Sequence, residues 1–344
     1  MPLSTHYLGF TLKNPLVASP SPPNAHLDHL RRLEDAGIAA VVLPSLFEEQ
    51  IEADTSYQER ILSAGVYNSP ETTNYLPEQA LDIAGPYHIG PDAYLDLVCR
   101  ARAALAIPVI ASLNGASDSG WIEYAKQIAQ AGANALELNI SIIPTDLTMS
   151  GADIEARHLA IVAAVRGEVE LKIAVKLSPC LTAPGHLTLA LEEKGANGVV
   201  LFNRIVQPDI NPATLSLVEN IHLSTQEESQ IPLMWTALLA GRTKLSLAAS
   251  TGVETGRDVV KYLLAGADVV MTTSSLLRHG PLHAARLLSE VEDWMAARGF
   301  TSVAQVRGLL SWSRSRHRER YGRTSYLHLL GSGPGLWETA GAIG

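Results

Sequence analysis

The chain has 344 residues, of which 47 % are hydrophobic and 18 % charged, and its net charge is −9. This composition excludes a disordered chain, which needs low hydrophobicity and high charge, and the negative balance argues against general nucleic-acid binding. We expect neither a signal peptide nor a membrane span, because no apolar run reaches the ~18–20 residues that cross a bilayer. Two cysteines and eleven histidines without ligand spacing predict no metal site and a reduced, cytoplasmic setting.

The elements alternate along most of the chain. Residues 4–13 predict a small hairpin, and short apolar strands are expected at 16–19, 107–113, 171–177 and 245–249. Helical periodicity is found at 26–36, 91–106, 119–131, 153–166, 256–265 and 281–298.

One pattern occurs four times and supplies the other strands. A helix-like segment ends in small residues and Gly, and an apolar strand follows directly, at 35–44, 130–139, 194–203 and 264–273. Glycine at a helix C-terminus lets the chain turn sharply, and a continuous apolar strand implies burial on both faces, as in a parallel sheet. Eight strands in one series without a linker predict the α/β class and a single (β/α)8 TIM barrel over residues 1–310.

Three segments depart from the repeat. Long insertions at 45–90 and 204–244 follow the second and sixth strands, where they are expected to shape an active site. Residues 311–344 are expected to form an Arg-rich helix and a Gly-rich end, without being an independent domain. We interpret this tail as a solvated or subunit-contacting helix and not as a nucleic-acid arm.

Chemistry in such barrels occurs at the C-terminal ends of the strands. Here the strand exits carry polar, mostly uncharged residues around a single lysine: Ser19, Ser45, Asn114, Asn139, Lys176, Asn203, Ser250, Thr251, Gly252, Thr273 and Ser274. One cation among amides and hydroxyls suits an anionic or polarised planar ligand. The loops after the seventh and eighth strands are the usual phosphate site of the fold. Lys176 itself could act as a cation toward a ligand or as a Schiff-base nucleophile.

At these residues the chain resembles the class 1 dihydroorotate dehydrogenases, which are FMN-dependent (β/α)8 barrels. The likeness covers about residues 1–310 and is carried by the stretches 14–19, 90–96, 137–141, 175–179, 251–258, 263–267 and 299–304. The resemblance implies that Lys176 faces the pyrimidine edge of FMN and that Asn114 and Asn139 bind the isoalloxazine. It also implies that Ala18 and Ser19 lie beneath the ring, and that the two loops, with Ser250, Thr251, Gly252, Thr273 and Ser274, hold the phosphate.

The substrate side departs from the family. Ile142 stands where the family has a catalytic Cys or Ser, and an aliphatic side chain cannot accept a proton. Pro44 replaces a family lysine, and Asp82 replaces an asparagine that contacts the substrate. The candidate catalytic residues are therefore Lys176, Ser141 and Asp82, with Glu48, Glu49, Tyr67 and Asp146 as further candidate bases.

Three functions are left open by the sequence. The first is an FMN-dependent oxidoreductase that acts on CH–CH groups, with dihydroorotate or a related small molecule as substrate. The second is a flavin-binding barrel without turnover, and the third is a Schiff-base lyase of the class I aldolase type that uses Lys176. A homodimer is left open, and the electron acceptor is not specified by any motif.

Overall fold

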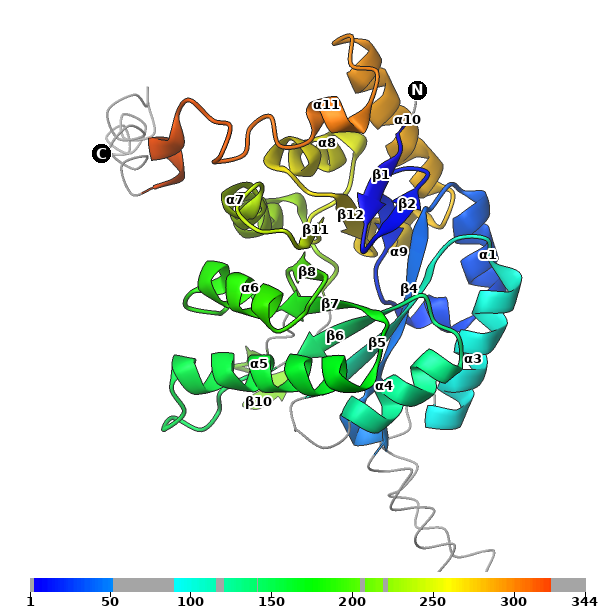
Figure 1. The fold of residues 1–344 in the computed structure, drawn as a ribbon, viewed down its shortest axis with the longest axis vertical. Coiled ribbons are helices and arrows are strands. Elements are labelled where there is room, and N and C mark those ends of the chain that lie inside the picture. The colour runs from blue at the N-terminus through cyan, green and yellow to red at the C-terminus, as the bar shows by residue number, and fades with distance from the viewer. Residues whose placement is uncertain are drawn as a thin grey trace, which may run out of the picture.

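The computed structural model describes residues 3–51, 90–115, 121–140, 142–204, 208–218 and 222–322. Eight parallel strands form a closed barrel in which β12 pairs with β3 and β8 pairs with β11 (Figure 1). In chain order the strands are β3 (Leu16–Ala18), β4 (Ala40–Phe47), β5 (Val109–Gly115), β6 (Ala135–Ile140), β7 (Lys172–Leu177), β8 (Gly198–Leu201), β11 (Ser246–Ala249) and β12 (Val269–Thr272). The predicted α/β class and (β/α)8 TIM barrel are therefore confirmed.

Helices surround the barrel, as Figure 1 shows. They are α1 (Leu27–Asp35), α3 (Pro91–Ala104), α4 (Trp121–Gln130), α5 (Gly151–Glu168), α6 (Pro184–Glu193), α7 (Gln230–Leu239), α8 (Gly256–Ala265), α9 (Ser274–His279), α10 (His283–Ala296) and α11 (Val303–Val306). The glycines of the four repeats have φ between +88° and +122°, at Gly37, Gly132, Gly195 and Gly266. The predicted sharp turn between helix and strand is thus present in every copy.

The barrel has an outer and an inner apolar core, because alternate residues of each strand point to opposite faces. The outer core lies between the strands and the helices. The inner core contains small and branched side chains, among them Val17, Val42, Ile110, Ala174, Val200 and Met271. The antiparallel hairpin of β1 (Thr5–Tyr7) and β2 (Phe10–Leu12) joins the inner core through Tyr7, Leu8 and Leu12. The predicted N-terminal hairpin is therefore confirmed.

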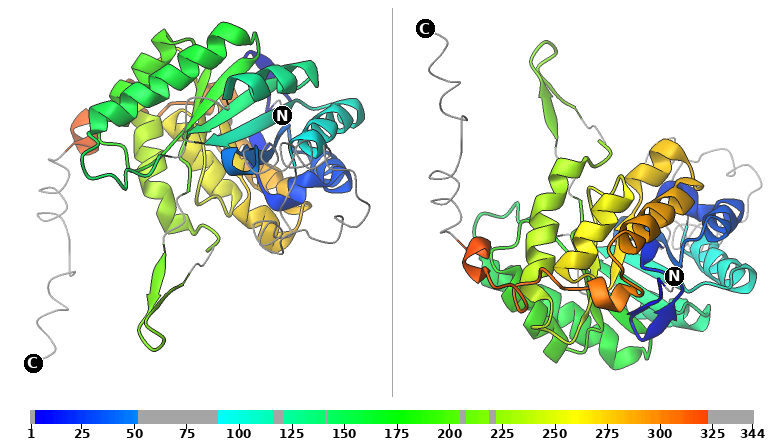
Figure 2. Two further views of the ribbon diagram at one scale, coloured as in Figure 1. Left: turned by 90° about the horizontal axis from the view of Figure 1, so that it is seen from below. Right: turned by 90° about the horizontal axis from the view of Figure 1, so that it is seen from above.

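The segment after β8, predicted as an insertion at 204–244, contains regular secondary structure. It begins with an antiparallel hairpin of β9 (Asp209–Asn211) and β10 (Ser216–Val218), which projects away from the barrel (Figure 2). A 3-10 helix, η4 (Gln226–Ser229), and the barrel helix α7 follow. Sequence analysis missed α7 because its apolar residues are not confined to one face, and missed α6 because Pro184 and Gly185 at its start resemble a turn.

The insertion predicted at 45–90 begins inside the barrel wall. Strand β4 continues to Phe47, and a helical turn occupies 48–51. Ser45 pairs with Ser112 of β5, and their hydroxyl oxygens lie 2.8 Å apart. Residues 52–89 of this insertion lie outside the described residues.

Up to residue 322 the C-terminal segment contains no α-helix after α11, and the rest of the Arg-rich helix and tail predicted at 311–344 lies outside the described residues. In the part described to residue 322, turns lead from α11 to a single 3-10 helix, η5 (Arg318–Tyr321). Trp312 lies between the guanidinium groups of Arg242 and Arg318, which are 4.6 and 4.7 Å from its ring centroid. The segment lacks the periodic apolar face that stabilises a surface helix, and stacking on Trp312 holds it instead.

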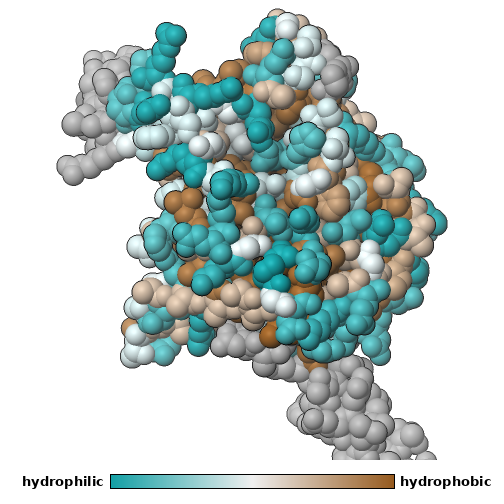
Figure 3. All heavy atoms as spheres, viewed as in Figure 1, coloured by the Kyte–Doolittle hydropathy of each residue, from teal (hydrophilic) through white to brown (hydrophobic). Residues whose placement is uncertain are grey.

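The face in Figure 3 is mostly hydrophilic, with apolar patches scattered between the helices. Among the described residues, no helix combines the length and the apolar character that crossing a bilayer would need.

Candidate functional site

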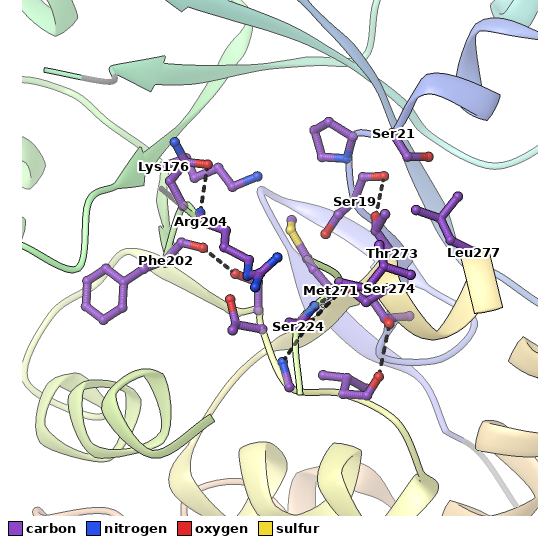
Figure 4. Close-up of a pocket in the computed structure, with 18 of the residues that line it drawn as sticks. Ser19, Ser21, Lys176, Phe202, Arg204, Ser224, Met271, Thr273, Ser274 and Leu277 are labelled. Carbon is purple, nitrogen blue, oxygen red and sulfur yellow. Dashed lines mark hydrogen bonds between the residues drawn. The ribbon is translucent and has the colours of Figure 1, made fainter. Parts of the chain in front are cut away.

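A cleft lies at the C-terminal mouth of the barrel, lined by the ends of strands and by the segment 222–224 (Figure 4). Its volume of about 380 Å³ lies within the ~300–1,000 Å³ typical of small-molecule sites. Most of the predicted cofactor residues line it: Ser19, Lys176, Asn203, Ser250, Thr251, Gly252, Thr273 and Ser274. Residues that are up to 255 positions apart in the sequence (274 − 19 = 255) are thus brought together as predicted.

Lys176 is the buried cation of this cleft. It pairs in register with Asn139 of β6, which pairs in turn with Asn114 of β5. Lys176 is 7 % exposed, and its Nζ lies 3.5 Å from Oε1 of the fully buried Glu137. A buried ammonium needs such a partner because desolvation penalises its charge. Since Lys176 also lines the cleft, its ammonium can donate to an anionic or polarised ligand.

The loop after β11 has an unusual backbone. Thr251 and Gly252 have φ of +80° and +72°, and positive φ is rare for a β-branched residue. The Tyr262 hydroxyl donates to the Thr251 carbonyl at 2.7 Å and holds the loop in place. A Cβ atom on Gly252 would lie 2.8 Å from the Ser229 Cβ and 2.9 Å from the Thr225 carbonyl oxygen. Only glycine fits there, so η4 can pack directly on the loop.

The loop after β12 is linked to the loop after β11 through hydrogen bonds to Ser224. The Thr273 hydroxyl donates to the Ser19 carbonyl at 3.0 Å. Ser274 Oγ accepts from the Ser224 backbone N–H at 3.0 Å and lies 2.9 Å from Ser224 Oγ. The Gly252 N–H points at Ser224 Oγ at 3.3 Å. Backbone N–H groups and hydroxyls therefore gather at one end of the cleft, where they bond to one another. Groups of these kinds can also donate to the oxygens of a phosphate.

Four predicted cofactor residues are not among those that line the cleft: Ala18, Ser45, Asn114 and Asn139. Asn114 lines a small separate cavity with Glu48 and Trp121. Asn139 is buried, and within the described part of the chain its Oδ1 has no hydrogen-bond partner. Buried acceptors are normally satisfied, so this amide oxygen beside Lys176 is an observation that fits a ligand at the cleft.

The predicted catalytic residues are only partly described. Lys176 is in the cleft, whereas Ser141 and Asp82, and the further candidate Tyr67, lie outside the described residues. Ile142 is half-buried and packs against the outer core, so no proton acceptor stands at that position. Hydrogen bonds from Thr148 lower the pKa of the exposed Asp146, which makes this carboxylate a weaker base.

Several residues of the cleft were not predicted from the sequence, among them Arg204, His222 and Ser224. Arg204 donates to both carboxylate oxygens of Glu228, at 2.9 and 3.2 Å. It directly follows Asn203 at a strand exit, and that position could have indicated it. His222 and Ser224 reach the cleft from the far end of an insertion, and no local pattern identifies them. Glu137 was identified only as part of a motif, although a charged residue inside an apolar strand is itself a signal.

Comparison with known proteins gives the family. A family model described as dihydroorotate dehydrogenase matches residues 68–295. The chain belongs to the dihydroorotate dehydrogenase family. Dihydroorotate dehydrogenase A (fumarate) of Lactobacillus helveticus is 26 % identical, over 78 % of this chain and 85 % of its own length. The putative dihydroorotate dehydrogenase A (fumarate) of Aeropyrum pernix is 28 % identical, over 59 % and 67 %. The dihydroorotate dehydrogenase B (NAD(+)) catalytic subunit of Bacillus pumilus is 28 % identical, over 60 % and 67 %.

Membership confirms the resemblance found in the sequence motifs. Enzymes of the dihydroorotate dehydrogenase family are flavoprotein oxidoreductases of pyrimidine biosynthesis that act on CH–CH groups and use FMN. The predicted enzyme class and cofactor are therefore confirmed at the level of the family. In the described ranges, no group of three or more His, Cys, Asp or Glu side chains is arranged to hold a metal ion.

Proposed function

We propose that this chain is an FMN-dependent oxidoreductase that holds the cofactor in the cleft, with the phosphate at the loops after β11 and β12. The pyrimidine edge of the ring then lies at Lys176. The observation that carries the proposal is the pairing of a buried ammonium, Lys176, with a cluster of hydroxyl and N–H donors at the other end of one cleft. FMN bound there supplies a two-electron acceptor for a hydride from the substrate.

The residues around the cleft divide this task. The Lys176 ammonium favours negative charge on the ring edge. Asn139 lies next to Lys176 in register, and Asn114 lies next to Asn139. Ser274 and the Gly252 N–H orient the phosphate end. Asn203 is a polar residue of the cleft lining, and Ala18 would leave room beneath the ring.

The substrate is a small molecule, and we propose that the protein does not oxidise dihydroorotate efficiently. A positioned general base typically contributes roughly 10²–10⁴-fold in rate, and Ile142 cannot act as one. Pro44, buried in β4, supplies no cation to compensate an anionic substrate. Ser141 and Asp82 remain the proposed catalytic partners of Lys176.

The Ile142 side chain also favours a second candidate function, a flavin-binding barrel without turnover. The Schiff-base alternative is disfavoured by the ion pair of Lys176 with Glu137, because a nucleophilic lysine must lose its proton. We propose a cytoplasmic protein without a nucleic-acid partner; its electron acceptor and its assembly as a homodimer are left open.

The first experiment is the visible spectrum of the purified protein, followed by identification of the chromophore released on denaturation. Two flavin bands and released FMN are expected. FAD, haem or no chromophore would contradict the proposal.

The second experiment tests the substrate side. Ile142→Cys combined with Asp82→Asn should raise dihydroorotate oxidation, and the matched control is Ile143→Cys with Asp82→Asn, since Ile143 is the exposed neighbour. The control should give no increase. Turnover by the unmodified protein at ~1–10³ per second would show that another base replaces the one missing at Ile142.

A further inference from the structure

Glu137 is a carboxylate inside the barrel, one layer below the cleft. It lies on β6 between Ser112 of β5 and Ala174 of β7, and its exposed fraction is zero. Its Oε1 faces the Lys176 ammonium at 3.5 Å. Its Oε2 has no hydrogen-bond partner among the described residues. Among the described residues, the only charged group paired with the Glu137 carboxylate is thus Lys176 at the cleft.

A carboxylate at this place is costly. The inner core consists mainly of alanine, valine, leucine, isoleucine and methionine side chains, together with Tyr7, and burying a charge there carries a large desolvation penalty. Replacing a buried ion pair by apolar residues is often neutral or stabilising. Stability alone therefore does not account for Glu137, and its contact with a cleft residue indicates a functional role.

Tyr7 approaches the same region from the hairpin that closes the barrel. Its ring is 1 % exposed and its hydroxyl has no partner in the described residues. Burial, and then the charge of Glu137, raise the pKa of Tyr7 well above its usual value, so this group stays neutral. Glu137 consequently meets one cation, Lys176, and that cation is on the cleft side.

We propose that Glu137 is a positioning residue that holds the Lys176 ammonium at the cleft and offsets its charge, and thereby sets the reduction potential of the bound flavin. The inference rests on the proposed function, since it requires FMN at Lys176. The carboxylate touches neither cofactor nor substrate and acts through Lys176.

The direction in which Glu137 shifts the flavin potential follows from its negative charge. The ammonium favours electron density on the ring edge, and the carboxylate behind it opposes this. Glu137→Gln keeps the side-chain size and an acceptor oxygen but removes the negative charge. The uncompensated ammonium should then raise the affinity of the protein for reduced flavin, relative to oxidised flavin, by roughly tenfold. This magnitude follows for a negative charge removed within about 10 Å of the ring at an effective dielectric constant of about 20. For a two-electron couple this corresponds to a midpoint potential about 30 mV more positive.

The experiment measures this potential for the flavin-loaded protein at pH 6 in wild type, Glu137→Gln and a matched control, Asp268→Asn. Asp268 is also a buried carboxylate in an ion pair, with Arg307, but it lies at the opposite end of the barrel near the N-terminal hairpin. Glu137→Gln should shift the potential upward and Asp268→Asn should not. Glu137→Asp keeps the negative charge but places it one methylene further from Lys176, so its flavin potential should lie between those of Glu137→Gln and wild type. This variant replaces Glu137→Gln if Glu137→Gln does not fold.

A second readout does not need the cofactor. In the apoprotein, reductive methylation of Lys176, followed by mass spectrometry, should be several-fold faster in Glu137→Gln than in wild type or Asp268→Asn, because the ammonium is no longer held. Wild-type protein that binds no FMN would refute the proposed function, and the labelling rates would then decide the role of Glu137. Equal labelling in all three proteins, or an unchanged potential in flavin-loaded Glu137→Gln, would overturn the inference.

Discussion

Gly252→Ala tests whether the loop after β11 depends on close contact with the segment that follows the β9–β10 hairpin. Gly252 has φ of +72°, and an added Cβ would meet the Ser229 Cβ at 2.8 Å, the Thr225 carbonyl oxygen at 2.9 Å and the Ser229 nitrogen at 3.0 Å. Two of these three atoms belong to the backbone, so the overlap cannot be relieved by a side-chain rotation. Either the loop or η4 must move.

The expected loss of stability has two parts. A left-handed conformation costs an L-residue about 1–2 kcal/mol, and overpacking in a close-packed region costs about 1–3 kcal/mol. The sum is about 2–5 kcal/mol. With an unfolding entropy of about 2.1 cal/mol/K per residue, the 344 residues give roughly 0.7 kcal/mol/K, and the Tm should fall by roughly 3–7 °C.

Thermal unfolding of the apoprotein measures this loss, and Gly299→Ala is the control. Gly299 also has φ of +72°, but an added Cβ there would have no atom within 4 Å. The control should lose only the conformational part, roughly 1–3 °C. Gly252→Ala should also weaken FMN binding, and Gly299→Ala should not. Equal losses of Tm in the two variants would refute the argument that η4 packs on the phosphate loop.

Other perturbations test the charges of the site. Lys176→Met should destabilise the apoprotein by about 3–5 kcal/mol in urea denaturation, because it leaves Glu137 buried without its cation; a loss below about 1 kcal/mol would contradict the ion pair. Burial would raise the pKa of Asp258, but hydrogen bonds from Lys261, Gln226 and Thr255 outweigh it and hold that pKa below its usual range. The stability that Asp258 contributes is therefore present above its unfolded pKa of about 3.9 and lost as the pH falls further, so urea midpoints below about pH 4 should drop more steeply in wild type than in Asp258→Asn. With a net charge of −9, we expect no salt-sensitive DNA binding in a mobility-shift assay.

The barrel could be predicted because its signal repeats along the chain. Four helix–Gly–strand units, with glycines such as Gly37 and Gly266 at positive φ, identify a parallel sheet without any tertiary information. The predictions failed where the pattern is not periodic. Helix α7 is apolar on several faces, and the Arg-rich tail is held by stacking on Trp312 rather than by a helical face.

The grouping of strand-end residues in one cleft could be predicted for a related reason. Ser19, Lys176 and Thr273 occupy strand ends, and barrel closure alone brings strand ends together. Ser224 and His222 reach the cleft at the end of an insertion, and the path of an insertion is not encoded in a local pattern. The partner of Lys176 was missed because a sequence shows that Glu137 is buried but not which cation it meets.

The fold constrains some residues of the site more strongly than others. The residues proposed to face the cofactor are tied to the framework. Removing Lys176 leaves Glu137 unpaired in the inner core, and a Cβ atom on Gly252 would displace η4. Of the departures from the family pattern, Ile142 follows β6 and packs against the outer core, whereas Pro44 lies within β4 and Asp82 lies outside the described residues. An exchange at Ile142 disturbs no inner-core ion pair, so it costs less stability than an exchange at Lys176. A barrel of this design can therefore lose the base that suits one substrate while it keeps FMN, and a flavoprotein with an altered substrate is the outcome that the distribution of constraints favours.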